Sequence, residues 1–366
     1  MSANTGPEPT TDRNDGSQAP LTIKDIARLT GVSIGTVDRV LHNRGRVSAE
    51  NVAKIRALVA DRGYKPNLFA SRLSGGSATR TLGVLIPNLD QDFGYWRLIA
   101  NGVEKAAKEL GPLQLEVKFE TFDRQSPEDL ARAFASVADL PGLALAPIHA
   151  RVLRPMVEAF EPGRPVVFFD TDMACAKDHC FVGQDPWQGG NLAARLLDLT
   201  LPGGAPLVLV QFEDDDEHLV ARGRAFEEGA RGAGRRVEIL AQTLSDPLAR
   251  RLSEAGAFFE SLPPDAGLFV PNASAGEYAR VAGGRRVVGY DLIPAHQAAL
   301  RDGSLSFVLS QRPELMGYEA VLRLGRALLF QEPLVPKIAL PLDIVVRENL
   351  TGHLEWSEVP PPSTGL

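Results

Sequence analysis

The chain has 366 residues, 44% of them hydrophobic and 23% charged, and a formal net charge of −7. These values are ordinary for a globular protein of two or three domains. No stretch of 18 apolar residues occurs, the first residues do not resemble a signal peptide, and two cysteines define no disulfide framework. We therefore expect a cytoplasmic protein.

The charge is unevenly distributed along the chain. Residues 1–20 are polar and rich in Pro, Gly, Ser and Thr, and we expect this tail to be disordered. Residues 21–80 contain eleven Lys or Arg against four Asp or Glu, whereas residues 81–366 carry a net charge of −12. A small basic module thus precedes a large acidic one, which favours a polyanion partner for the first module alone.

Three short helices are predicted in the basic module, residues 21–64. The first, TIKDIARLTG, has Thr22 as its N-cap and Gly31 as its end, and the second, VSIGTVDRVLHN, has Ser33 as its N-cap. The third, SAENVAKIRALVADRG, begins at Ser48. The short turn around Gly31 is typical of a helix-turn-helix, although two helices of an ordinary domain can show the same pattern. The expected core consists of Ala27, Val32, Val37, Val40, Val52, Ile55, Leu58 and Val59.

In a helix-turn-helix, the second helix lies in the major groove of DNA and its first turns contact base edges. Arg39 is a candidate for base recognition because its guanidinium matches the O6 and N7 acceptors of guanine. The other candidates for base contacts are Ile34, Gly35, Thr36 and Asn43.

A further short helix is predicted between Pro66 and the Gly75–Gly76 pair, in the stretch KPNLFASRLSGG. At about two turns it is too short to be stable alone in water, so it would form on contact with a partner. Its apolar face includes Leu73, and an apolar side chain can wedge between base steps in the minor groove. A plain linker is the alternative.

Residues 22–76 resemble the DNA-binding headpiece and hinge helix of the lactose-repressor/galactose-repressor family. The stretches TIKDIARLTGVSIGTVDRVLHNRGRVS and GYKPNLFASRLSGG carry this resemblance. It implies that Leu73 is the hinge leucine inserted at the operator centre and that Arg39 is the arginine of the recognition helix. It also implies phosphate contacts at Thr22 and Ser33.

Two residues of the second helix depart from the family pattern. Asp38 stands where many members have a serine that contacts the DNA backbone, and Gly35 replaces a larger side chain that reads bases. An acid at this position can accept from cytosine N4 or orient Arg39, and it would repel a phosphate. Because of these departures, the preferred operator sequence stays open. The predicted mode of DNA binding is unaffected.

From about residue 81, short β-branched runs alternate with amphipathic helices, which indicates a doubly wound α/β architecture. Ligands of such folds bind beyond the carboxyl ends of the strands. We expect a linker at 65–80, an effector and dimerisation domain at 81–350 and a C-terminal tail at 351–366. The predicted buried parallel strands are TLGVLIP, QLEVKFETF, GLALAP, PVVFFD, PLVLVQF, GLFVP, RRVVGYD and LSFVLS.

Residues 81–350 resemble the sugar-sensing, periplasmic-binding-protein type domain of the same family, through the order of motifs such as FVGQDPWQGG and VVGYD. The resemblance implies two doubly wound lobes joined by three crossovers, so that neither lobe is one continuous segment. The expected fold is thus an all-α helix-turn-helix headpiece followed by an α/β periplasmic-binding-protein-like domain of two lobes.

Polar side chains after several predicted strand ends form the candidate effector site. Carboxylates accept from hydroxyl groups, an arginine donates to oxygens, and amides do both, while an aromatic ring can stack on a sugar. Taken singly, each residue is better explained as a cap or a turn, and only the ordered set favours a ligand site. A departure is Ala273, where many relatives have an Asp. The residues that fall on effector-contacting positions by resemblance, or that offer a ring, are Phe93, Tyr95, Asp170, Arg222, Asn272, Asp291 and Gln311.

The acidic stretch EDDDEH at 213–218 has three interpretations. It is a divalent-metal site, a solvated loop that places acids at a helix N-terminus, or a source of one acid for the effector. The second is preferred. CAKDHC at 175–180 lacks the second ligand pair that zinc requires, so we predict no metal and no cofactor.

The sequence therefore predicts a DNA-binding transcriptional regulator, expected to be a repressor, whose operator affinity responds to a sugar or polyol. A homodimer or a tetramer would bind a pseudo-palindromic operator of double-stranded DNA, with no membrane partner. The alternatives are a solute-binding protein, which would have an export signal and no headpiece, and a sugar-modifying enzyme. Since P-loop, GxSxG and HExxH motifs are absent, we expect no enzymatic activity.

Overall fold

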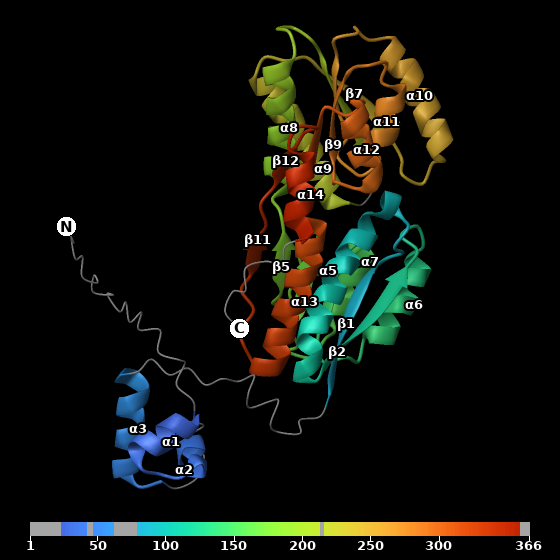
Figure 1. Cartoon of the computed structure of the whole chain (residues 1–366). Helices are drawn as coiled ribbons and strands as arrows, with labels where there is room; N and C mark the ends of the chain where they lie inside the picture. The colour runs from blue at the N-terminus through green and yellow to red at the C-terminus, as the bar shows by residue number, and fades with distance from the viewer. Residues whose placement is uncertain (1–22, 42–46, 62–78, 213–215, 359–366) are drawn as a thin grey trace, which may run out of the picture. The chain divides into compact units, whose positions relative to one another are not determined.

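The computed structural model divides the chain into two compact units, Met1–Gly76 and Ser77–Leu366 (Figure 1). Each has its own hydrophobic core. Within the described part of the chain, no helix combines the length and the apolar character that a membrane span requires. The residues that the structure describes are 23–41, 47–61, 79–212 and 216–358.

The first unit contains the three predicted helices. Their buried residues are Ile26, Ala27, Val37, Val40 and Ile55, so the small core expected from the sequence is confirmed. Val32, Val52, Leu58 and Val59 are only partly buried and pack against it, because so small a unit leaves most of its side chains at the surface. The helices are α1 (Ile23–Thr30), α2 (Ile34–Leu41) and α3 (Ala49–Asp61).

The turn between α1 and α2 has the geometry that its residues predict. Gly31 adopts a φ of +72°, which lets the amide of Val32 donate to the carbonyl of Ala27 at 3.1 Å and closes the helix end. At the start of α2, the Oγ of Ser33 accepts from the amide of Thr36 at 3.2 Å. The turn therefore fixes the orientation of α2 relative to α1.

The second unit contains two six-stranded sheets. Strand orders are β11-β5-β4-β3-β1-β2 in the first lobe and β12-β10-β9-β8-β6-β7 in the second, and only β12 pairs antiparallel, with β10. The two doubly wound lobes are thereby confirmed. The strands are β1 (Arg80–Pro87), β2 (Leu115–Phe122), β3 (Leu143–Leu145), β4 (Val166–Phe169), β5 (Cys180–Gly183), β6 (Leu207–Phe212), β7 (Val237–Gln242), β8 (Gly267–Phe269), β9 (Arg286–Tyr290), β10 (Phe307–Ser310), β11 (Lys337–Ala339) and β12 (Asp343–Val345).

Helices pack on the sheets of both lobes, as Figure 1 shows. In the first lobe α5 and α13 lie together, and in the second lobe α8 and α9 do so. Two single-turn 3-10 helices are also present, at Asp92–Gly94 and Gly111–Leu113. The helices are α5 (Tyr95–Leu110), α6 (Pro127–Val137), α7 (Ala150–Glu158), α8 (Pro186–Thr200), α9 (Glu217–Gly232), α10 (Leu248–Glu260), α11 (Ala275–Val281), α12 (Pro294–Asp302), α13 (Pro313–Phe330) and α14 (Leu350–Glu358).

The chain crosses between the lobes three times, after β5, after β10 and between β11 and β12, as the resemblance implied. All eight predicted strands are present. β5, β7, β11 and β12 were missed, since β11 and β12 have three residues each and β7 is a partly exposed edge strand. The prediction that QLEVKFETF is buried is wrong in its middle, because β2 is also an edge strand.

The end of the second unit also differs from the prediction. Residues from 351 onward were expected to form a tail, but helix α14 continues to Glu358. Leu350 is buried in the core of the second lobe, and Leu354 packs against it. This apolar contact explains why the fold extends beyond residue 350.

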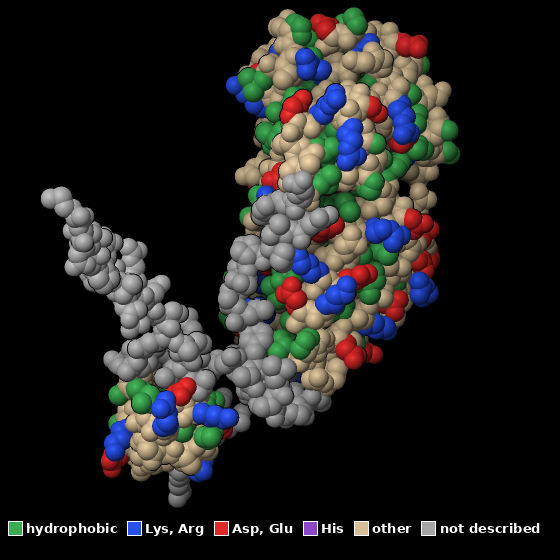
Figure 2. Space-filling model, in the orientation of Figure 1, with side chains coloured by type: hydrophobic (Ala, Val, Ile, Leu, Met, Phe, Trp, Pro, Cys, Tyr) green, Lys and Arg blue, Asp and Glu red, His purple; other side chains and the backbone are tan. Residues whose placement is uncertain are grey.

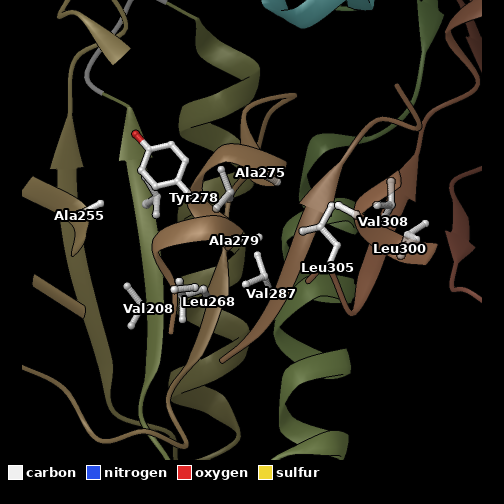
Figure 3. Packing of buried hydrophobic residues seen from close by; sticks show 14 of the residues in the cluster. Val208, Ala255, Leu268, Ala275, Tyr278, Ala279, Val287, Leu300, Leu305 and Val308 are labelled. Carbon is white, nitrogen blue, oxygen red and sulfur yellow. The ribbon is translucent and has the colours of Figure 1, made fainter. Parts of the chain in front are cut away.

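The core of the second lobe shows why the sheet is stable. In Figure 3, strand residues such as Val208, Leu268 and Val287 lie close to Tyr278 and Ala279 of α11. All five are less than a tenth exposed. Each large side chain contributes about 1.5–3 kcal/mol to stability when it is fully buried. This core therefore holds the strands, and the residues at their ends, in fixed positions.

Candidate functional site

Helix α2 presents one face to solvent and one to the core. Val37 and Val40 are buried, which turns the predicted contact residues outward. Ser33, Ile34, Gly35 and Arg39 are exposed, while Thr36 and Asp38 are half-buried. Ile34 is 50% exposed, a large apolar side chain that the headpiece core does not use.

Arg39 lies back along its own helix. Its Nε donates to the carbonyl of Gly35 at 3.1 Å, so the guanidinium is held beside the first turn of α2. Figure 2 shows Lys and Arg side chains on the visible face of this unit. Asp and Glu side chains lie on the same face, so the view shows a mixed rather than a purely basic surface, and base contact by Arg39 stays a prediction.

Three predicted DNA contacts, Thr22, Asn43 and Leu73, lie outside the described residues. The predicted hinge helix lies there as well. These predictions therefore rest on the sequence alone.

In the second unit, a cavity of about 830 Å³ lies between the two lobes. Its wall comes mainly from loops at the carboxyl ends of strands in both sheets, the place that an α/β fold favours for ligands. The structure brings together all seven residues predicted from the sequence. Those that line the cavity are Phe93, Tyr95, Asp170, Arg222, Asn272, Asp291 and Gln311.

Gln311, at the second crossover, connects the two lobes inside the cavity wall. Its amide nitrogen donates to the Tyr95 hydroxyl at 2.8 Å, and its Oε1 accepts from Arg222 at 2.9 Å. The Tyr95 hydroxyl in turn donates to Asp170 Oδ1 at 2.6 Å. Burial, together with the carboxylates of Asp170 and Asp291, raises the pKa of Tyr95 well above its usual value, so the hydroxyl remains a donor.

Arg222 is buried and held rigidly. Its Nη1 donates to the carbonyl of Pro271 at 3.0 Å, and its guanidinium lies over the ring of Tyr290 at 3.8 Å. The glycine pair of FVGQDPWQGG permits this packing, because a Cβ at Gly190 would overlap the carbonyl of Arg222. The Nε of Arg222 has no hydrogen-bond partner among the described residues. It therefore retains capacity to donate.

Asp291 is the least satisfied acid of the wall. Its side chain is 3% exposed, and its Oδ1 has no hydrogen-bond partner within the part of the chain that is described. Burial raises the pKa of Asp291 to about 7, although the charge of Arg222 lowers it and that of Asp170 adds to it. Burial also raises the pKa of Asp170. Burial thus disfavours the ionised form of both groups, and hydroxyl donors from a ligand would stabilise the carboxylates.

Backbone strain is concentrated at the cavity. Among the described residues, eight residues other than glycine have a positive φ, and five of them line this cavity. A positive φ costs free energy for a side-chain-bearing residue and persists where the surroundings enforce it, often at functional sites. The five are Asp92, Phe93, His149, Asp170 and Asp291.

A second connection between the lobes involves Arg124. It pairs with Asp92 of its own lobe at 2.5 Å and with Asp216 at the start of α9 in the other lobe. His218 forms a further link, through Nδ1 to the hydroxyl of Thr171. Burial and nearby arginines lower the pKa of His218 well below its usual value, so it stays neutral.

These contacts bear on the described end of the 213–218 stretch. Residues 213–215 lie outside the described residues, but Asp216 is buried at the N-terminal end of α9 and borders the cavity. A fully solvated loop is therefore wrong for Asp216, because Arg124 draws it inward. Within the described residues, no group of three or more His, Cys, Asp or Glu is arranged to bind a metal.

The aromatic residues differ in how freely they can meet a ligand. Trp96 is fully buried and its indole donates to Asp92 at 2.6 Å, and Tyr95 is fixed by its hydrogen bonds. Phe93 is 37% exposed, so it is the ring best placed to stack on a sugar. Asn272 accepts from the amide and hydroxyl of Ser274, which is typical of a turn and leaves its ligand role a prediction.

Comparison with known families accounts for both units. The family described as periplasmic binding protein domain matches residues 82–332, and the family described as bacterial regulatory proteins, lacI family, matches residues 22–67. The chain belongs to the lacI family of bacterial regulatory proteins. Curated relatives of this lacI-family chain are regulators of transcription and not enzymes.

Two curated relatives illustrate the extent of the similarity. The sucrose operon repressor of Streptococcus mutans is 29% identical over 191 residues, which is 48% of this chain and 51% of the relative. The catabolite repressor/activator of Escherichia coli is 39% identical over 92 residues, 24% of this chain and 27% of the relative. The lacI-family chain thus spans about half the length, or less, of the curated relatives it matches.

Solved structures share the fold of the second unit. A solute-binding protein of Agrobacterium vitis with bound D-fucose aligns with a TM-score of 0.67 at 18% identity, over 76% of this chain and 99% of the other. The glucose-galactose binding protein of Geobacillus stearothermophilus aligns with a TM-score of 0.61 at 22% identity, over 75% and 99%. At such identities the likeness establishes the fold of the lacI-family effector domain and nothing more.

Several residues of the cavity wall were not predicted as ligand contacts. Arg124 follows a predicted strand end, so the rule that found the other residues could have found it. His149 also follows a predicted strand, GLALAP, by two residues, and Asp92 adjoins Phe93, so the same rule could have found both. Arg251 carries no such local signal. The wall of a cavity between two lobes depends on packing that sequence periodicity does not describe.

Proposed function

We propose that this chain is a transcriptional repressor whose affinity for an operator is set by a polyhydroxylated small molecule in the interlobe cavity. A helix-turn-helix and a binding domain of sugar-binding fold on one chain support this function. The observation that carries it is a cavity wall with buried polar atoms, Asp291 Oδ1 and Arg222 Nε, that have no partner among the described residues. Two carboxylates, an arginine and two amides suit a sugar or polyol.

The coupling follows from the position of the cavity between the lobes. A ligand that contacts both lobes favours one lobe angle over another, in proportion to its difference in affinity. In a dimer, that angle would set the spacing of two headpieces on a pseudo-palindromic operator. Such coupling is typically about 1–3 kcal/mol, or roughly 5- to 150-fold in operator affinity. A regulator of this kind acts in the cytoplasm, where the chromosome is.

The experiment has two steps on the full chain. Selection from random duplex DNA identifies the operator, and a thermal-shift screen of monosaccharides and polyols identifies a stabilising ligand. The ligand is expected to change operator affinity 5- to 150-fold in the wild type, by the usual size of allosteric coupling. Asp291→Ala should bind the operator normally but lose the response. A mutant that responds at the same ligand concentration would contradict the proposed cavity site.

A further inference from the structure

Arg251 lines the cavity but is not among the ligand residues predicted from the sequence. It lies in the first turn of α10 and is 6% exposed. Its Nε donates to the carbonyl of Asp246 at 3.2 Å, which fixes the guanidinium, and its Nη1 has no hydrogen-bond partner among the described residues. A buried N–H that lacks an acceptor is costly, so an unsatisfied Nη1 at a cavity wall points to a ligand.

The acidic residues near Arg251 form ion pairs with Arg250 instead. Asp246 and Glu254 pair with Arg250 at 3.3 Å and 2.9 Å, on the exposed side of the helix. No ion pair within the described residues includes Arg251. Of the three arginines in the cavity wall, Arg124 has two carboxylate partners and Arg222 lies near Asp291. Arg251 lies near the rings of Phe212 and Tyr278 and, among the described residues, has no carboxylate in an ion pair with it.

The backbone at the start of α10, beside Arg251, also favours a negatively charged ligand. Helix α10 begins after Pro247, which makes no side-chain cap, while the carbonyl of Pro247 accepts from the amides of Arg250 and Arg251. The amides of Leu248 and Ala249, which precede them, are the ones at the open end of the helix. The preceding residues, Leu244 and Ser245, border the cavity. The N-terminus of a helix of 13 residues attracts anions through its dipole and the amides at its open end.

We propose that the effector of this regulator carries an anionic group, a phosphate or a carboxylate, which binds Arg251 and the N-terminus of α10. This inference rests on the proposed function of the cavity and names the chemical class of its ligand. The hydroxyl groups of the same molecule face Asp291 and Asp170. A volume of about 830 Å³ accommodates a sugar together with such a group.

Inorganic phosphate tests the anion site without knowledge of the sugar. The full chain is titrated with phosphate against chloride at constant ionic strength, and the thermal transition of the second unit is followed by tryptophan fluorescence. Phosphate should stabilise the wild type, and Arg251→Gln should weaken its binding roughly 10- to 100-fold, the loss of a charge-assisted hydrogen bond. Arg251→Lys keeps the charge and should retain part of the binding.

Arg250→Gln is the matched control, because it removes the same charge one residue away from a side chain that is 61% exposed. It should bind phosphate as the wild type does. Phosphate that binds the headpiece affects all four proteins equally and cancels in the comparison. Equal stabilisation of the wild type and Arg251→Gln, or no stabilisation of the wild type, would overturn the proposal.

A second set of ligands distinguishes phosphate from carboxylate and separates this inference from the proposed function. Glucose, glucose 6-phosphate and gluconate are compared on the wild type and on Arg251→Gln, and the variant should lose only the preference for the anionic members. Anionic and neutral ligands that bind the wild type alike would overturn the anion site. Operator binding and its dependence on Arg39 are measured separately, so the proposed function can stand when the anion site fails.

Discussion

The two units of this chain present polar side chains in opposite ways. Arg39 of α2 and Ser33, which caps this helix, are exposed, and three short helices with a small core hold them. In the cavity, Asp291 and Arg222 are at most 3% exposed and stand between two six-stranded sheets. An exposed group keeps its hydration until a partner arrives, whereas a buried one has lost it already.

The two sites therefore differ in how much free energy their polar groups cost the folded protein. The headpiece keeps its charges at little cost but has a small reserve of stability, because its core is small. The cavity has strained backbone and a carboxyl whose pKa is raised to about 7, and large cores on both sides stabilise it. The comparison predicts that mutations act in one unit without affecting the other.

The largest effect is expected from the headpiece core. Ile55 is fully buried, and Ile55→Ala should cost about 2–5 kcal/mol, which is comparable with the whole stability of so small a unit. Operator binding should be lost, while the urea transition of the second unit is unchanged. Tryptophan fluorescence reports that transition, since Trp96, Trp187 and Trp356 all lie in the second unit.

Leu268→Ala is the matched deletion in the second unit, where Leu268 is also fully buried. It should lower the free energy of unfolding by a similar amount, yet leave the unit folded and operator binding intact. Wild-type operator affinity in Ile55→Ala would mean that the two cores are not separate in the way described.

The second effect concerns the buried charge of Asp291. Its pKa is about 7 in the folded protein and about 4 in an unfolded chain, so between these pH values the folded state holds a proton that the unfolded state has lost. The free energy of unfolding of the wild type should therefore fall as pH rises from about 4 to 7, by roughly 1.4 kcal/mol per pH unit at most.

Asp291→Asn cannot ionise, so it should be more stable than the wild type by a few kcal/mol at pH 8 and nearly equal to it at pH 4. Urea unfolding at both pH values measures this difference. Asp265→Asn, at an exposed position, is the control and should change stability little at either pH. A stability difference independent of pH would contradict the raised pKa.

The contrast also explains what could be predicted from the sequence. The three helices of the headpiece were predicted, because caps such as Ser33 and the turn at Gly31 are local signals. Asp170 and Asp291 were found because both directly follow buried strands. Arg251 was missed, since its place in the wall depends on how loops of two lobes meet, and this arrangement leaves no periodic pattern in the sequence.

The third effect is on DNA recognition. Arg39→Ala should weaken operator binding by about 1–3 kcal/mol and relax the base preference. The reason is that an exposed arginine adds little to folding and acts mainly through its contact with DNA. Fluorescence anisotropy with operator and random duplexes measures both affinities. Arg28→Ala removes an equal charge from α1, where the side chain is 75% exposed and pairs with Asp25. It should lower both affinities alike, so equal selectivity in the two mutants would exclude base contact by Arg39.

The smallest effect compares one kind of contact in both units. Ser33 caps α2 through the amide of Thr36 at 3.2 Å, and Ser126 caps α6 through the amide of Asp129 at 3.1 Å. Replacing either serine with alanine should cost about 1 kcal/mol, because the hydrogen bond is the same.

The same loss should shift the two melting temperatures unequally, because the shift is the loss divided by the unfolding entropy. At about 2.1 cal/mol/K per residue, this entropy is on the order of 0.1 kcal/mol/K for three short helices and 0.6 kcal/mol/K for the second unit. Ser33→Ala should therefore lower the headpiece transition by about 10 °C, and Ser126→Ala the other transition by about 2 °C. Calorimetry of the full chain resolves both. Equal shifts would show that the units unfold as one, and the contrast between them would then describe their surfaces rather than their stability.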